Sequence, residues 1–188
     1  MLGRQVELSE LFRKTALERA SNIGVTELVL FNTLPEEMNL DILRPSLRAL
    51  RQTFPDLNLG MELHENTITD AAFMKELREL LNEQEMLLVY DDFGAGQSRL
   101  IELLDSVPDI LKFDIALIKD IQHRSEASRS MVETLVKMAR DAGIRTLAEG
   151  VENIEEAAAC RAIGFELGQG FYLGRPAPLQ SPAIFSPQ

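Results

Sequence analysis

Residues 87–98 read LLVYDDFGAGQS, and this stretch decides the fold. An apolar run of strand length ends in two adjacent carboxylates, Asp91 and Asp92, and then opens into a loop with two glycines. This order is typical of a buried parallel strand that delivers acidic side chains to the rim of a barrel or sheet. Acidic pairs at strand ends are common, so the pair gains weight only because the arrangement recurs.

The recurrence consists of five further apolar runs, each followed by a polar residue. They are 28–31 before Asn32, 57–61 before Glu62, 110–111 before Lys112 and Asp114, 144–148 before Glu149, and 165–168 before Gln169. Strand-like runs that alternate with helical segments predict a parallel α/β fold.

Three helical segments carry apolar stripes, which we expect to pack in the core. The stripes are Leu8, Leu11, Phe12, Ala16 and Leu17, then Phe73, Leu77, Leu80 and Leu81, then Met131, Leu135, Met138 and Ala139. We further expect a helix from Pro45 to Gln52, a cap at Thr69 or Asp70, and helix ends at Gly143 and Gly164.

Composition favours one globular domain and excludes several classes of partner. A chain of 188 residues that is 45% apolar can bury a good core. A formal net charge of −11 opposes binding to a nucleic-acid polymer. No apolar run is long enough to insert in a membrane and no signal-peptide pattern is present, so we expect a cytoplasmic protein. The single cysteine, Cys160, is expected to pack rather than react.

The polar residues at the strand ends suggest a cation site. The carboxyl ends of parallel strands meet on one face, so the carboxylates of Glu62, Asp91, Asp92, Asp114 and Glu149 should converge there with Asn32. Like charges this close repel unless cations neutralise them. Oxygen-only ligands suit Mg²⁺ or Mn²⁺, and two such ions about 3.5–4 Å apart can clamp a phosphodiester. The alternative is that these acids are solvated strand ends paired with surface Lys and Arg.

Several strings together resemble one known family, the EAL domain of cyclic di-GMP phosphodiesterases. They are YDDFGAGQSRLIELL, ILKFDIALIKDI, LAEGVEN and GFELGQGFYLGRP, with LFNTLP and MELHEN earlier in the chain. The resemblance runs from about Leu8 to Pro178. It implies a TIM-like (β/α) barrel in residues 1–178, a C-terminal tail in 179–188, and two-metal hydrolysis of cyclic di-GMP to pGpG in bacterial signal transduction.

Transferred residue by residue, the resemblance also implies a role for each site residue. Asn32, Glu62, Asp91 and Asp92 are implied as metal ligands, and Lys112, Glu149 and Gln169 as residues that act on the hydrolytic water, the metal or the substrate. Glu65 is implied to anchor the loop 93–98, and Asp114 and Glu152 to support the site. Mg²⁺ or Mn²⁺ is the implied cofactor. Cyclic di-GMP is the implied ligand, with a second copy or a regulatory domain as protein partner.

The sequence departs from the family pattern in three places. The Glu-Ala-Leu signature is absent, and we count six strand candidates where the barrel has eight. Ala95 replaces the usual Thr of the loop, and His64 and Asn66 stand where Thr and Ser are common. We therefore expect an N-terminally incomplete barrel. Either the chain is a fragment of a longer protein, or its open edges pair with another chain.

We weigh three functions at this point. The first is a cyclic di-GMP phosphodiesterase that is weak or inactive because one Glu ligand is missing. The second is a non-catalytic module that binds cyclic di-GMP or a protein. The third is a Schiff-base aldolase that uses Lys112, which fails on chemistry because neighbouring carboxylates favour the charged amine.

Overall fold

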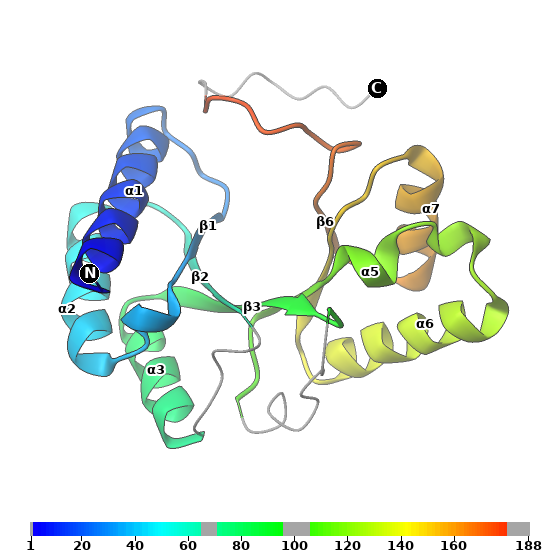
Figure 1. The fold of residues 1–188 in the computed structure, drawn as a ribbon, viewed down its shortest axis with the longest axis horizontal. Helices are drawn as coiled ribbons and strands as arrows, with labels where there is room; N and C mark the ends of the chain where they lie inside the picture. The colour runs from blue at the N-terminus through cyan, green and yellow to red at the C-terminus, as the bar shows by residue number, and fades with distance from the viewer. Residues whose placement is uncertain (1, 65–70, 96–105, 180–188) are drawn as a thin grey trace. The chain divides into compact units, whose positions relative to one another are not determined.

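In a computed structural model of the chain, residues 2–64, 71–95 and 106–179 are described (Figure 1). Within these residues, helices separate the six strands except between β3 and β4, and every strand pairing that is resolved is parallel, which confirms the predicted α/β class. The elements are α1 (Leu2–Asn22), β1 (Val29–Asn32), η1 (Pro35–Glu37), α2 (Leu40–Thr53), β2 (Leu59–His64), α3 (Ala71–Glu83), β3 (Met86–Phe93), β4 (Ile110–Phe113), α5 (Ile115–Ile118), η3 (Ile121–His123), α6 (Glu126–Asp141), β5 (Arg145–Ala148), α7 (Ile154–Ile163) and β6 (Leu167–Gly168).

The chain divides into two compact units. The first unit comprises residues 1–62, 72–87 and 177–188, and it contains the parallel pair of β1 with the first part of β2. The register sets Val29 opposite Leu59 and Asn32 opposite Glu62, so these last two residues lie side by side at the carboxyl ends of their strands. Helix α1 lies against β1 and η1 (Figure 1).

The second unit comprises residues 63–71 and 88–176, and it contains most of β3 together with β4, β5 and β6. These strands are neighbours in chain order, and Phe113 of β4 lies opposite Ala148 of β5, which lies opposite Gly168 of β6. The residues that follow these strands therefore emerge at the same edge. Helix α6 packs against β5 and α7 packs against η3 (Figure 1).

The predicted apolar stripe of α6 is confirmed at Ala139 and wrong at its two methionines. Met131 and Met138 are 60% and 45% exposed, whereas Val132, Val136 and Ala139 are buried. Both sets have helical spacing, so periodicity alone does not distinguish them. The larger methionine side chains thus lie on the solvent side of α6, and the smaller valines lie on its buried side. Residue size alone would suggest the opposite arrangement.

The predicted stripe of α1 is confirmed at one residue of five, and Ala16 is among those that are exposed. Leu17 is buried, but Leu8, Leu11 and Phe12 are exposed by 48%, 57% and 65%. The stripe of α3 is confirmed at Leu77, Leu80 and Leu81, which are buried together with Met74. The difference follows from what each helix covers, which a single sequence does not reveal.

Helix α2 begins five residues before the predicted start at Pro45. Asn39 caps it, since its side-chain oxygen accepts a hydrogen bond from the Asp41 amide at 2.8 Å. Pro45 lies inside the helix on its exposed side, where the carbonyl left without an amide partner can meet water.

Other local predictions are confirmed. Gly164 ends α7 with a φ of 106°, and Gly143, with a φ of 78°, follows the end of α6. Cys160 is buried, and burial together with Glu156 raises the pKa of its thiol to about 11, so it packs rather than reacts. The predicted cap at Thr69 or Asp70 lies outside the described residues.

The corrected register of α6 can be tested by a pair of alanine substitutions. Val136→Ala should lower the free energy of unfolding by about 1.5–3 kcal/mol, because its side chain is fully buried. Met131→Ala should change it by no more than about 0.5 kcal/mol. Urea denaturation followed by circular dichroism measures both free energies of unfolding. A larger loss of stability in Met131→Ala than in Val136→Ala would support the stripe that the sequence predicted.

Candidate functional site

A bulge near the end of β3 brings two adjacent carboxylates to one side of the sheet. The register with β4 shifts between Tyr90 and Phe93, and Asp92 has a left-handed φ of 60°. In a regular strand, neighbouring side chains point to opposite faces. The extra residue and the left-handed backbone let Asp91 and Asp92 face the same space, which no residue pattern in the sequence indicates.

Glu149 completes a cluster of three carboxylates. It follows β5 directly, and its amide donates to the Phe113 carbonyl at 3.0 Å. One side-chain oxygen each of Asp91, Asp92 and Glu149 lies within 4.8 Å of the others. Asp91, Asp92 and Glu149 were all predicted to converge at the strand ends, and within the second unit they do.

Lys112 lies among these acids as a buried cation. Its side chain is 5% exposed, and its Nζ lies 2.8 Å from Asp91 Oδ1 and 2.7 Å from Glu149 Oε1. Burying an ammonium is costly unless it is paired and hydrogen-bonded, and here two carboxylates provide the pairing. The lysine and the three acids together carry two formal negative charges.

Burial raises the pKa of Glu149 above its ordinary value. Lys112 acts in the opposite direction, through its hydrogen bond and its charge, while the charges of Asp91 and Asp92 raise the pKa further. The net effect is a raised pKa. The favourable contact with Lys112 therefore does not fully offset the desolvation cost of burying the ionised Glu149 carboxylate.

His64 contacts the same cluster. Its Nε2 lies 2.9 Å from Asp92 Oδ2, with both side chains partly exposed. In the sequence this histidine stood out only as a departure from the family pattern. The contact arises because β2 ends at His64 and the bulge turns Asp92 toward it.

The first unit brings Asn32 and Glu62 together. The two are register partners, Glu62 is buried and Asn32 is exposed. Thr33 donates from its hydroxyl to the Glu62 carbonyl at 2.9 Å, which ties the end of β1 to β2. Both strand ends therefore lie where the sequence predicted.

The remaining predicted residues have mostly backbone or capping contacts. Gln169 is exposed, and its backbone N–H donates to the Ala148 carbonyl at 2.8 Å. Asp114 caps α5 by accepting from the Ala116 amide at 2.8 Å. Glu152 is exposed, with its carboxylate 3.9 Å from Lys119 Nζ. Glu65 and residues 96–98 of the loop it was predicted to anchor lie outside the described residues.

Gly150 follows Glu149 directly and has a backbone conformation that favours glycine. In the structure, Gly150 has a φ of 70°, and a Cβ there would lie 2.4 Å from the side chain of Ile115. Packing against Ile115 is therefore sufficient to require glycine.

Sequence reasoning missed a buried acid that supports the loop after Glu149. Glu156 is 1% exposed, and its carboxylate accepts from the amides of Glu152 at 2.7 Å and Asp120 at 2.9 Å. Burial alone would raise its pKa, but these backbone hydrogen bonds outweigh burial and lower it. The spacing from Asn153, which caps α7, to Glu156 is that of a capping box and was the available signal.

Comparison with known proteins identifies the family of this site. A sequence model of the EAL domain matches residues 3–176. Cyclic di-GMP phosphodiesterase PdeR of Escherichia coli K12 is 32% identical over 139 residues, which cover 69% of this chain and 20% of PdeR. Probable cyclic di-GMP phosphodiesterase PdeN of the same organism is 26% identical over 92% of this chain and 33% of PdeN. The chain thus spans a third or less of these two relatives.

Solved structures show the same fold. The PaMucR phosphodiesterase in complex with c-di-GMP has a TM-score of 0.82 at 28% identity, covering 94% of this chain and 79% of that one. Klebsiella pneumoniae BlrP1, in a manganese and cyclic di-GMP complex, has a TM-score of 0.74 at 30% identity, covering 88% and 43%. None of the helices in the described residues is long and apolar enough to cross a membrane.

These matches confirm an incomplete (β/α) barrel of EAL type, with six strands in the described residues. The predicted division into one domain over residues 1–178 and a tail over 179–188 stays a prediction. By its sequence match over residues 3–176, its fold and its DDFG and AEGVE motifs, the chain belongs to the EAL domain family.

Proposed function

We propose that this chain binds cyclic di-GMP and hydrolyses one of its phosphodiester bonds to give pGpG. The observation that carries this proposal is the cluster of Asp91, Asp92 and Glu149 around Lys112, formed by the motifs through which the chain resembles its family. The names of PdeR and PaMucR, and the cyclic di-GMP in two solved relatives, support the choice of substrate.

The donor set fits a hard divalent cation. All three clustered donors are carboxylate oxygens, the ligands that Mg²⁺ and Mn²⁺ prefer, and their charge exceeds that of Lys112. We propose Asp91 and Asp92 as ligands in the second unit, and Asn32 and Glu62 as ligands in the first. Bound divalent ions would supply charge stabilisation at the phosphodiester and a water of lowered pKa.

The chain's own residues have separate tasks in this proposal. Lys112 keeps Asp91 and Glu149 in place through its two short contacts and presents positive charge to the phosphate or to the attacking water. Glu149 would lie beside a bound metal and substrate, and Gln169 would orient water. The two carboxylates on Lys112 favour the ammonium form, which opposes a Schiff-base mechanism.

Further parts of the proposal rest on family resemblance. Asp114, Glu152 and Glu65 would support the site and its loop. The protein partner would be a second copy of the chain or a regulatory domain. The protein would be located in the cytoplasm. Hydrolysis by these 188 residues alone should be slow, because the Glu of the family's Glu-Ala-Leu strand is not among them. Misplacing a reacting group by about 1 Å can lower a rate about a hundredfold.

Removal of one proposed ligand tests the metal site. Asp91→Asn should weaken Mn²⁺ binding at least about tenfold in a calorimetric titration, because it removes a charged oxygen donor. Asp141→Asn is the matched control, since Asp141 is exposed in the same unit and its ion pair is with Lys137 on the same helix. Equal Mn²⁺ affinity in Asp91→Asn and the control would contradict the metal assignment.

A two-stage assay tests the substrate. Calorimetry should show binding of cyclic di-GMP in the presence of Ca²⁺, and chromatography should show slow release of pGpG after addition of Mg²⁺ or Mn²⁺. Lys112→Met should bind but release no pGpG. Binding without any turnover by the unaltered chain would instead establish a non-catalytic cyclic di-GMP module, and failure to bind would refute both functions.

The charge of Glu149 gives a pH-dependent prediction. Because its folded-state pKa is raised, the stability that this carboxyl confers is full below its ordinary value of 4.5 and is lost as pH rises through the folded-state value. Glu149→Gln should therefore melt at a higher temperature than the unaltered chain at pH 7 without divalent cations, and the gap should shrink at pH 4.

The exposed Glu133→Gln on α6 provides the control for this series, and its melting temperature should stay close to that of the unaltered chain at both pH values. Saturating Mn²⁺ should stabilise the unaltered chain more than Glu149→Gln, since a cation offsets the cost of the charge. A Glu149→Gln variant less stable than the unaltered chain at pH 7 would contradict the account.

A further inference from the structure

The first unit contains a buried ion pair that none of the roles above uses. Arg13 of α1 and Glu37 of η1 have side chains 3% and 1% exposed, and Arg13 Nη2 lies 2.8 Å from Glu37 Oε1 and 2.9 Å from Oε2. Ser9 donates to Glu37 Oε2 at 3.1 Å. Burying two charges costs desolvation energy, so apolar residues of similar volume would often serve packing equally well or better.

The pair fixes the end of β1 from both sides of Thr33. Arg13 Nη2 donates to the Asn32 carbonyl at 3.2 Å, and Glu37 Oε2 accepts from the Leu34 amide at 2.7 Å. The Thr33 hydroxyl itself donates to the Glu62 carbonyl at 2.9 Å. Three consecutive residues are thus held at the point where the two proposed ligands of this unit are register partners.

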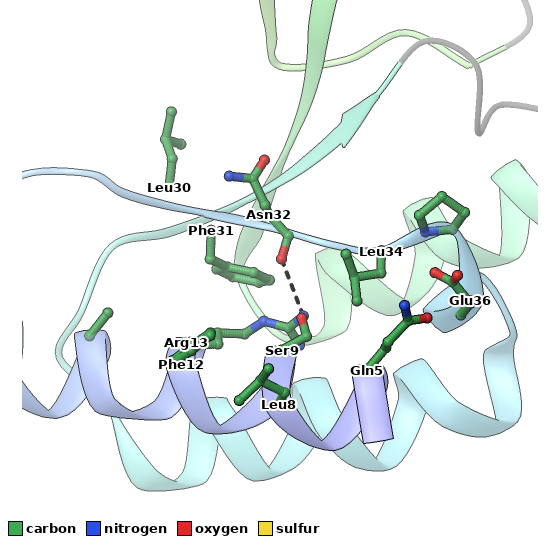
Figure 2. A pocket seen from close by; sticks show the side chains of 12 residues that line it. Gln5, Leu8, Ser9, Phe12, Arg13, Leu30, Phe31, Asn32, Leu34 and Glu36 are labelled. Carbon is green, nitrogen blue, oxygen red and sulfur yellow. Dashed lines mark hydrogen bonds between the residues drawn. The ribbon is translucent and has the colours of Figure 1, made fainter. Parts of the chain in front are cut away.

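Asn32 needs such support because its own side chain is exposed. Figure 2 shows its amide pointing away from α1 while its carbonyl faces Arg13 and accepts the hydrogen bond. β1 is only four residues long, and within the described residues it pairs with β2 alone. The orientation of the amide therefore depends on where the backbone of Asn32 is held.

The bonding of Arg13 differs from that of an arginine used only for stability. Its Nη2 makes every hydrogen bond, while its buried Nε and Nη1 have no partner among the described residues. Its guanidinium lies 5.1 Å above the centre of the Phe31 ring. Arg51 in the same unit instead uses Nε, Nη1 and Nη2 on five backbone carbonyls, those of Phe54, Pro55, Leu57, Gln84 and Glu85.

We propose that the Arg13–Glu37 pair positions Asn32 so that its side-chain oxygen can bind a divalent cation. The pair itself touches neither cation nor substrate, so both members are positioning residues. This inference rests on the proposed function, since it requires Asn32 to be a metal ligand. It means that the buried charges serve to hold the metal site in shape. Their removal should therefore weaken metal binding even under conditions where the variant is fully folded.

Arg13→Lys tests the inference against the control Arg51→Lys. Lysine retains the charge, but its side chain is shorter, so its ammonium should not reach both Glu37 and the Asn32 carbonyl as the single Nη2 of Arg13 does. Both variants should melt at lower temperature than the unaltered chain. At a temperature where circular dichroism shows each to be folded, Arg13→Lys should bind Mn²⁺ about tenfold more weakly in calorimetry, and Arg51→Lys within about twofold of the unaltered chain.

Two further variants keep the outcomes distinct. Asn32→Ala should weaken Mn²⁺ binding; if it does so while Arg13→Lys matches Arg51→Lys, the pair is only structural and the inference is overturned. If Asn32→Ala binds Mn²⁺ normally, the proposed ligand itself is wrong and the inference fails with it. If Arg13→Lys does not fold, Glu37→Gln replaces it, since it keeps the shape and removes the charge, and it should show the same weakening.

Discussion

The arrangement of charges at the ends of β3, β4 and β5 depends on the buried ammonium of Lys112. Three carboxylate oxygens within 4.8 Å of one another repel strongly, and the two short contacts from Lys112 remove part of that repulsion. The cluster exists only because the bulge at Asp91 and Asp92 turns neighbouring side chains to one side. Two formal negative charges remain, and the charges of Asp91 and Asp92 add to burial, the larger cause, in raising the pKa of Glu149.

Buried acids hold the connections on which the proposed ligands lie. Glu37 accepts from the Leu34 amide after β1, and Glu156 accepts from the Glu152 amide after β5. Buried backbone amides require hydrogen-bond acceptors. In these irregular segments no backbone carbonyl among the described residues is in position to accept, and each carboxylate serves as the acceptor instead. Glu37 pairs with the cationic Arg13, whereas Glu156 is stabilised by hydrogen bonds from backbone amides and with the Asn153 side chain. Both units thus use the same chemical solution at a strand end.

The alternation of apolar runs and polar residues predicted the six strands and the strand-end positions of the site residues, because that pattern depends only on local sequence. It could not predict the bulge, since a left-handed Asp92 is a backbone choice that several residue types permit. The stripes of α1 and α6 were misread at Phe12 and Met131, because exposure depends on what packs against each helix. Glu37 and Glu156 were overlooked because glutamate is ordinarily exposed.

The most direct test of the account is diffraction at the manganese absorption edge from crystals of the chain grown with Mn²⁺. The account predicts an anomalous peak within coordination distance of the carboxylate oxygens of Asp91 or Asp92, and the loss of that peak in Asp91→Asn. Well-ordered Asp91, Asp92 and Glu149 side chains with no anomalous peak beside them at saturating Mn²⁺ would contradict it. Lys112 would then offset the charge of these acids in place of a metal, and the chain could not act through a metal at this cluster.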